Sequence, residues 1–173
     1  MKDINFIYLK KLYIDNSNIS NMVLFAGENI NKGETILKFE GTLALQSDRY
    51  SGKYMGSTFV GLSESIMLCE TNESEKDFSD YINHSCNPNA GMFDCLTIIA
   101  IRDINIGDEI VCDYALGEAD EKWCLETKCN CRSSNCRGQV SRKDWLNISP
   151  GDEYYEYYSP FLKRRILEYA KRS

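Results

Sequence analysis

The sequence predicts a mainly β fold that ends in short helices, and three observations support this prediction. Short apolar runs rich in β-branched and aromatic residues recur along the first two thirds of the chain. Clusters of Asn, Asp, Ser and Gly separate these runs, as expected for strands joined by turns. Helix signals come late, where Ser149-Pro150 and Ser159-Pro160 each place a capping serine before a proline suited to the first helical position.

The expected strands follow one another along the chain. The first covers residues 4–14 and ends at the turn-rich segment 15–18. The others are expected at residues 22–26, 35–39 (after a turn at 31–33), 57–62, 65–68, 96–102 and 109–114.

Two short helices are expected at the C-terminal end, one after Ser149 and one over residues 161–172. Four aromatic residues recur there at helical spacing: Tyr154, Tyr157, Tyr158 and Phe161. This stripe either docks on the core or forms one wall of a substrate groove.

Length and composition indicate one domain. With 173 residues, 43% of them hydrophobic and 27% charged, the chain suffices for a single core but not for two. The sequence starts without an apolar leader, and its longest strongly apolar run, near residues 96–101, is too short to span a bilayer. We therefore expect a soluble, intracellular protein of the cytoplasm or nucleus, with a secreted effector as the alternative for a bacterial source.

The charge balance favours a basic partner. A formal net charge of -6 and a pI near 4.9 disfavour direct contact with nucleic acid, whose phosphates require a basic face. Acidic residues gather in segments 64–80 and 118–126. They either steer a lysine-rich peptide towards the protein or form an ordinary solvated surface.

Eight cysteines in an apparently cytosolic protein indicate metal binding or burial rather than disulfides. Cys129, Cys131 and Cys136 lie in a polar segment that has little apolar area to bury. They leave a tetrahedral zinc ion one ligand short, and Cys86, beside Ser85 and Asn87, is the candidate for the fourth. The sequence thus predicts a closed structural zinc site. The other four cysteines stand beside apolar residues and are expected to be buried free thiols: Cys69, Cys95, Cys112 and Cys124.

Three motifs occur in a fixed order. The first is Asn83-His84-Ser85-Cys86-Asn87-Pro88-Asn89, the second is Gly107-Asp108-Glu109-Ile110-Val111-Cys112-Asp113-Tyr114, and the third is Cys129-x-Cys131-x4-Cys136. Together they resemble a SET-domain protein lysine methyltransferase followed by a zinc-binding post-SET segment.

Earlier and later residues extend the resemblance over about residues 21–138. Leu24-Phe25-Ala26, Ile30-x-Lys32-Gly33-Glu34-x-Ile36 and Phe39-x-Gly41 are similar to the first SET motif. Trp123, Cys136-Arg137-Gly138 and the helical end resemble the short stand-alone SET proteins. This resemblance implies a SET domain over residues 1–120, a post-SET segment over 121–140 and a helical extension over 141–173.

The sequence departs from the family pattern at two places. Asn21 and Val23 occupy the two glycine positions of a Gly-x-Gly motif that usually lies against the cofactor, and Val disfavours a positive φ. Cys112 replaces an aromatic residue two positions before Tyr114. In the family this position helps to set how many methyl groups are added.

The resemblance also implies a fold and a reaction. Residues 107–114 are expected to thread beside 83–86 in a pseudoknot, while the zinc segment closes over the cofactor. The reaction is methyl transfer from S-adenosylmethionine to a lysine side chain of a basic protein or peptide such as a histone. A narrow dry channel would lower the lysine pKa from its usual value of about 10.4.

Individual roles follow from the same resemblance. Tyr114 is the expected catalytic residue, and the cofactor-binding residues are Met22, Leu24, Asn83, His84 and Trp123. Tyr81 and Cys112 are expected to line the lysine channel. Some alternatives stay open. Tyr81 and Cys112 either line the channel or pack in the core, and Trp123 either stacks near adenine or anchors the post-SET segment. For His84 we expect a positional role, not that of a general base. At the level of function, the alternative is a catalytically silent SET module that binds basic peptides.

Overall fold

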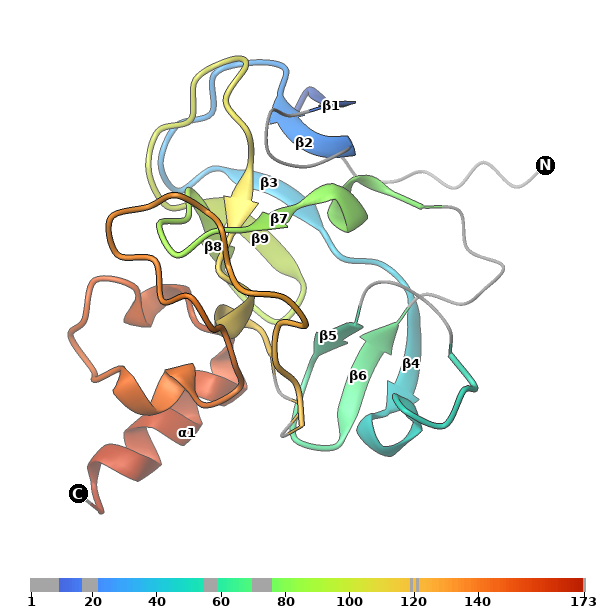
Figure 1. Ribbon diagram of the computed structural model, residues 1–173, viewed down its shortest axis with the longest axis vertical. Coiled ribbons are helices and arrows are strands. Elements are labelled where there is room, and N and C mark those ends of the chain that lie inside the picture. The colour runs from blue at the N-terminus through green and yellow to red at the C-terminus, as the bar shows by residue number, and fades with distance from the viewer. Residues whose placement is uncertain are drawn as a thin grey trace.

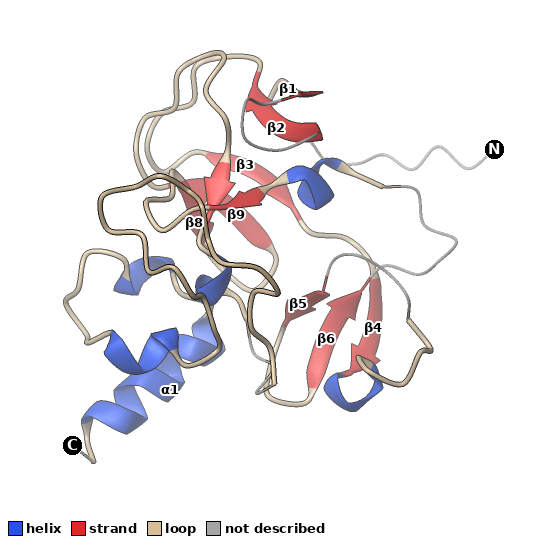
Figure 2. Ribbon diagram, viewed as in Figure 1, coloured by secondary structure: helices blue, strands red, loops and turns tan. Residues whose placement is uncertain are grey.

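The computed structural model describes residues 10–16, 22–54, 59–69, 76–118, 120 and 122–172. Figure 1 shows small sheets in the upper and right parts of the view and helix α1 (Pro160–Ala170) at the lower left. Figure 2 shows that strands dominate the body, whereas the C-terminal part is helical. The mainly β architecture that the sequence predicts is therefore confirmed.

The central sheet has five strands in the order β3-β9-β8-β10-β7. They are β3 (Thr35–Lys38), β9 (Thr97–Ala100), β8 (Ala90–Met92), β10 (Val111–Cys112) and β7 (Asn83–His84). All four residues of β9 are buried, as expected for a strand covered on both faces.

The strand β10 lies between β7 and β8, which follow one another in the sequence. It pairs in parallel with both of them, with Val111 opposite Asn83 and Cys112 opposite Ala90. The connection over residues 85–89 bonds to it as well, because Ser85 N donates to the Cys112 carbonyl at 3.0 Å and Asn89 N to that of Val111 at 3.1 Å. This crossing is the expected pseudoknot, and it brings the first two motifs into contact.

Two smaller sheets flank the central one. One pairs β1 (Leu12–Asn16) with β2 (Met22–Ala26), and the other has the order β4-β6-β5, from β4 (Thr42–Leu45), β6 (Ile66–Cys69) and β5 (Phe59–Gly61). Both sheets are antiparallel.

The C-terminal part packs on the same core as the strands. Tyr158, Phe161, Leu162 and Ile166 are each at most 3% exposed and lie in one cluster with strand residues such as Ile98. Short 3-10 helices complete the fold: η1 (Gln46–Asp48), η2 (Phe78–Tyr81), η3 (Tyr114–Leu116), η4 (Asp144–Asn147) and η5 (Tyr155–Tyr157). Of the aromatic stripe, Tyr158 and Phe161 are buried while Tyr154 and Tyr157 are half-buried, which agrees with docking on the core.

The strand predictions agree with the structure in position more than in length. Residues 22–26 form a strand as predicted, and those expected at 35–39, 65–68, 96–102 and 109–114 are shifted or shortened by a few residues. The strand expected at 4–14 lies partly outside the described residues, as does that at 57–62. Asp15 and Asn16, predicted to turn, are in β1 because they pair with Val23 and Met22 of β2. The strands β4, β7 and β8 were not predicted, because β7 and β8 are too short for a visible alternation.

The helix prediction is right at residue 160 and wrong at residue 150. Pro160 occupies the first turn of α1, and the N–H of Ser159 bonds to the Leu116 carbonyl at 2.8 Å, which ties the helix start to the site region. After Pro150, Gly151 has a φ of 102°, and the Asp152 carboxylate accepts the Ser149 N–H. A residue with positive φ ends any helical run, so this segment is a turn.

Candidate active site

Three segments that are distant in sequence meet around β10. The N–H of Ile110 donates to the Leu24 carbonyl at 2.8 Å, and the N–H of Ala26 donates to the Asp108 carbonyl at 3.0 Å. The start of the second motif therefore pairs with β2, while its end crosses the loop of the first motif. The main chain thus brings the three resembled SET segments together.

Two side-chain amides stabilise the crossing of β10 with the loop 85–89 through hydrogen bonds. Asn83 Nδ2 donates to Glu109 Oε1 at 2.8 Å, which fixes the plane of the Asn83 amide. Asn89 donates through Nδ2 to the Glu109 carbonyl at 2.8 Å and accepts the Val111 N–H through Oδ1 at 2.9 Å. The roles of Glu109 and Asn89 were not foreseen, although both belong to the motifs, because the bonds join elements about 20 residues apart.

The His84 imidazole packs against Tyr114. Its Nδ1 accepts the Tyr114 amide N–H at 3.3 Å, and the two rings meet edge to face with centroids 5.3 Å apart. Burial lowers the pKa of His84, which more than offsets the opposing effect of Asp113, 3.7 Å from Nδ1. The ring is therefore neutral near pH 7, which agrees with a positional role.

Tyr114 begins the short helix η3, which the Asp113 carboxylate caps by accepting the Ala115 N–H at 3.0 Å. The Tyr114 hydroxyl donates to the Ile82 carbonyl at 2.9 Å. Burial raises the pKa of Tyr114 to about 12. The phenol therefore stays protonated at neutral pH and acts as a hydrogen-bond donor rather than as a base.

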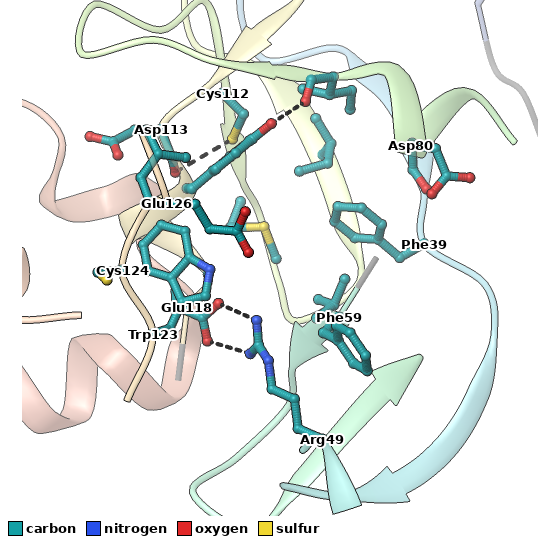
Figure 3. A pocket seen from close by; sticks show the side chains of 18 of the residues that line it. Phe39, Arg49, Phe59, Asp80, Cys112, Asp113, Glu118, Trp123, Cys124 and Glu126 are labelled. Atoms are coloured by element: carbon teal, nitrogen blue, oxygen red, sulfur yellow. Dashed lines mark hydrogen bonds and ion pairs between the residues drawn. The ribbon is translucent and has the colours of Figure 1, made fainter. Parts of the chain in front are cut away.

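A cavity of about 500 Å³ opens beside Tyr114. Its apolar wall comes from the central sheet, the sheet β4-β6-β5 and the segment after η3. Figure 3 shows Phe39 and Phe59 on one side of the cavity and Trp123 on the other. Four carboxylate residues also line it: Asp80, Asp113, Glu118 and Glu126. An apolar cavity with a few carboxylates suits a long apolar chain that ends in an amine.

Two of the predicted site residues share this cavity with Tyr114. Trp123 is half-buried, and its ring meets that of Tyr114 at an interplanar angle of 65° and a centroid distance of 6.3 Å. Cys112 is buried in the wall, where burial raises the pKa of its thiol to about 12. Cys112 therefore remains a neutral thiol.

Five predicted residues lie apart from the cavity lining, and two of them are Asn83 and His84 of β7. Tyr81 is half-buried against the core, with Lys76 Nζ 6.0 Å from its ring centroid. Leu24 is fully buried, and its carbonyl is already bonded to Ile110. Met22 is 48% exposed at the start of β2, and Asn21 lies outside the described residues.

The acidic segments are partly structural. Arg49 and Glu118 form a buried bidentate pair at 2.9 and 3.1 Å, visible in Figure 3, although the two residues are 69 positions apart. Asp120 accepts a hydrogen bond from the Tyr50 hydroxyl, and Glu64 pairs with Arg164 at 3.1 Å. The carboxylates of Glu118 and Asp120 thus bind the sheet β4-β6-β5 to the segment that leads to Trp123.

The four cysteines predicted to bind zinc come together. Their sulfur atoms lie within 4.8 Å of one another, and those of Cys86 and Cys129 are 3.9 Å apart. Four thiolates around a tetrahedral zinc ion at about 2.3 Å would be separated by roughly 3.8 Å, so the cluster fits this metal. The pKa of Cys131 is lowered: burial acts to raise it, but hydrogen bonds from the Ser133 hydroxyl and the Cys86 amide favour the thiolate.

The remaining cysteines do not all follow the prediction. Cys69 and Cys112 are buried, and Cys95 is half-buried. Cys124 is exposed, which corrects the expectation of a buried thiol. The neighbouring Leu125 suggested a core position, but this stretch runs along the cavity with main-chain contacts to residues 140–142 instead of entering the core.

The family model of the SET domain matches residues 21–115, which is more than half of the chain. The chain belongs to the SET domain family. SET methyltransferases use S-adenosylmethionine, and the four-cysteine cluster of this SET protein could bind a metal.

Relatives with curated names agree with this assignment. The chain is 29% identical over 141 residues to "Histone-lysine N-methyltransferase set1" of Dictyostelium discoideum. The matched region covers 74% of this chain and 9% of the relative. The chain is also 29% identical over 145 residues to human "Histone-lysine N-methyltransferase SETD1B", covering 76% of this chain and 7% of the relative. This SET protein thus spans less than a tenth of the length of either relative.

Solved structures share the fold. The methyltransferase domain of the human histone-lysine N-methyltransferase SETMAR superposes with a TM-score of 0.61 at 16% identity, over 77% of this chain and 58% of that one. KRYPTONITE in complex with mCHG DNA and SAH gives a TM-score of 0.58 at 20% identity, over 76% of this chain and 29% of that one. Among the described residues, no helix combines the length and apolar character needed to cross a membrane.

Proposed function

We propose that the chain is an S-adenosylmethionine-dependent protein-lysine methyltransferase. The observation that carries this proposal is the crossing of β10 with the loop 85–89, which brings Asn83 and His84 close to Tyr114. Tyr114 in turn lines an apolar cavity with acidic residues. Orientation of two reactants supplies much of the rate of such a transfer. A fixed crossing of three segments is well suited to provide it.

Cofactor binding is assigned to residues of β2 and β7 and to Trp123. When bound, S-adenosylmethionine supplies an activated methyl group on a positively charged sulfur. Asn83 offers an amide oxygen whose orientation Glu109 fixes, His84 offers its main chain, and Trp123 offers a ring face for adenine. Met22 and Leu24 complete the assignment through the main chain of β2, because the Leu24 side chain is in the core.

The cavity prepares the lysine for reaction. Its apolar wall removes water from the amine, which favours the neutral, nucleophilic form. Tyr114 stays protonated and directs its hydroxyl to the cavity wall, so it orients groups near the reacting centre without taking the lysine proton. Cys112, in the cavity wall, is assigned to the lysine channel, whereas Tyr81 lies outside the lining and packs against the core.

The four-cysteine cluster is proposed to hold one structural zinc ion through Cys86, Cys129, Cys131 and Cys136. Such an ion would join the first motif to the segment after Trp123, in which few side chains are buried. The proposed division is therefore a SET domain at residues 1–120, a zinc segment at 121–140 and an extension at 141–173.

The proposed substrate is a basic protein or peptide, such as a histone. Two observations support it: the names of the relatives and the net charge of -6. The same charge argues against direct nucleic-acid binding. An intracellular location, in the cytoplasm or nucleus, is proposed on the same grounds.

Titration calorimetry with S-adenosylmethionine separates an enzyme from a silent peptide-binding module. We expect one site per chain in the wild type and about tenfold or weaker affinity in Asn83→Ala, since cofactor polar groups would lose their partner. If Asn83→Ala bound S-adenosylmethionine with wild-type affinity, the cofactor site would not include Asn83. Peptide binding without cofactor binding would favour the silent module.

A further inference from the structure

The imidazole of His84 lies between the proposed catalytic residue and a proposed metal ligand. Its side chain is only 5% exposed. On one side, the Tyr114 amide N–H is 3.3 Å from Nδ1, and on the other side Nε2 is 3.4 Å from Cys86 Sγ. One rigid ring therefore spans from the Tyr114 main chain to the cysteine cluster.

The chemistry of the groups fixes the direction of both bonds. A backbone N–H can only donate, so Nδ1 is the accepting nitrogen, and a neutral imidazole then carries its proton on Nε2. Asp113 Oδ1 is 3.7 Å from Nδ1, beyond hydrogen-bond range, and it already accepts from Arg137 Nη2 at 2.7 Å and from Ala115 N at 3.0 Å. His84 thus accepts from Tyr114 and donates to the Cys86 sulfur.

We propose that His84 is a positioning residue that couples the four-cysteine site to Tyr114, an inference that rests on the proposed function of both. A thiolate that ligates a metal is oriented by the groups that donate to it, and such partners affect metal affinity. Loss of the metal frees the Cys86 sulfur, and the ring transmits this displacement to the Tyr114 amide. The metal site then controls the geometry of Tyr114, in addition to closing the fold.

A second connection runs parallel to the first. The Arg137 N–H donates to Cys86 Sγ at 3.4 Å, and its guanidinium binds Asp113, the residue before Tyr114. This connection supports the coupling but also means that removal of the His84 ring reduces the coupling without abolishing it.

Two half-replacements of His84 separate its two bonds. In His84→Asn, the amide oxygen stands near the position of Nδ1 and keeps an acceptor for Tyr114, while the side chain is too short to reach Cys86. In His84→Gln, the longer amide can donate to Cys86, while the acceptor for Tyr114 is lost. Each variant tests one bond, so the proposal stays open to contradiction if only one of them folds.

The readout is the fluorine resonance of 3-fluorotyrosine incorporated at position 114, recorded with Zn²⁺ and after chelation. In the wild type we expect chelation to shift this resonance. In His84→Asn the shift should fall by more than half and zinc affinity by about tenfold. In His84→Gln zinc affinity should stay within about threefold, while the resonance is displaced even with zinc bound.

Equal shifts on chelation in the wild type and in His84→Asn would overturn the proposal. Wild-type zinc affinity in His84→Asn would do the same, and so would a wild-type resonance position in zinc-bound His84→Gln. The measurement needs neither cofactor nor lysine substrate. A failure of the coupling is therefore distinguishable from a failure of the proposed methyl transfer, which would leave the fluorine response intact.

Discussion

Tyr114 combines a half-buried ring with a hydroxyl that faces the cavity wall. We expect Tyr114→Phe to lower kcat about a hundredfold or more, because it removes a hydrogen-bond donor at the proposed reacting centre. The free energy of unfolding should fall by only about 1 kcal/mol, the net value of one hydrogen bond. Steady-state kinetics and denaturant unfolding test both effects, with Tyr13→Phe on the exposed face of β1 as the control. A near-normal kcat would remove Tyr114 from the mechanism.

Cys112 is the residue expected to influence the number of methyl groups added. Its neutral thiol is small and a weak hydrogen-bond partner, so it leaves room in the cavity for a methylated amine to turn. We expect di- or trimethyl-lysine from the wild type and a shift towards monomethyl-lysine in Cys112→Tyr, provided that the ring fits without overpacking. Product mass spectra at long reaction times are decisive, and monomethyl-lysine alone from the wild type would contradict the assignment.

Among the elements, the segment 129–137 is the one that we expect to depend on the proposed zinc ion. It buries few side chains, whereas the sheets and α1 share an apolar core. We therefore expect one zinc ion per chain. A chelator should abolish activity at a concentration at which the far-ultraviolet circular dichroism signal of the sheets and α1 persists. Cys131→Ser should lose zinc, and Cys124→Ser, at an exposed cysteine outside the cluster, should retain it. Elemental analysis without zinc in wild-type protein purified free of chelator would refute the site.

The buried pair Arg49–Glu118 joins the sheet β4-β6-β5 to the segment after η3. Its side chains are 10% and 8% exposed, so Glu118→Gln leaves a buried guanidinium whose remaining carboxylate partner is Asp120 at 3.6 Å. We expect a loss of about 3 kcal/mol in the free energy of unfolding. The matched control Glu64→Gln, in a pair with side chains 50% and 59% exposed, should cost less than about 1 kcal/mol. Equal losses in chemical denaturation would show that the buried pair contributes no special stability.

The elements that could be predicted are those with a local signal. The strand β2 is an uninterrupted apolar run, and α1 begins at a proline in the predicted position. The strand β7 pairs with β10, and β8 pairs with β9 and β10. No pattern within two or three residues indicates a pairing partner that is distant in sequence. At Pro150 a helix-start signal was overridden by Gly151, whose positive φ the local sequence did not specify.

At the scale of the whole molecule, the candidate site was predictable where motifs tie residues together. Asn83, His84, Cys86 and Tyr114 lie in two motifs whose crossing places them side by side. Arg49 and Glu118 carry no such signal, since only the tertiary fold brings the two residues together across 69 positions. The exposed Cys124 illustrates the same limit, because its neighbours in sequence do not determine its exposure.

Protein-lysine methyl transfer is tested most directly by incubating the protein with labelled S-adenosylmethionine and a histone mixture, followed by mass spectrometry of the lysines. We expect time-dependent methylation of specific lysine side chains by the zinc-bound wild-type protein, and loss of most of this methylation in Tyr114→Phe. Absence of lysine methylation by folded, zinc-bound protein across histones and a cell lysate would contradict this expectation, as would methylation that Tyr114→Phe leaves unchanged.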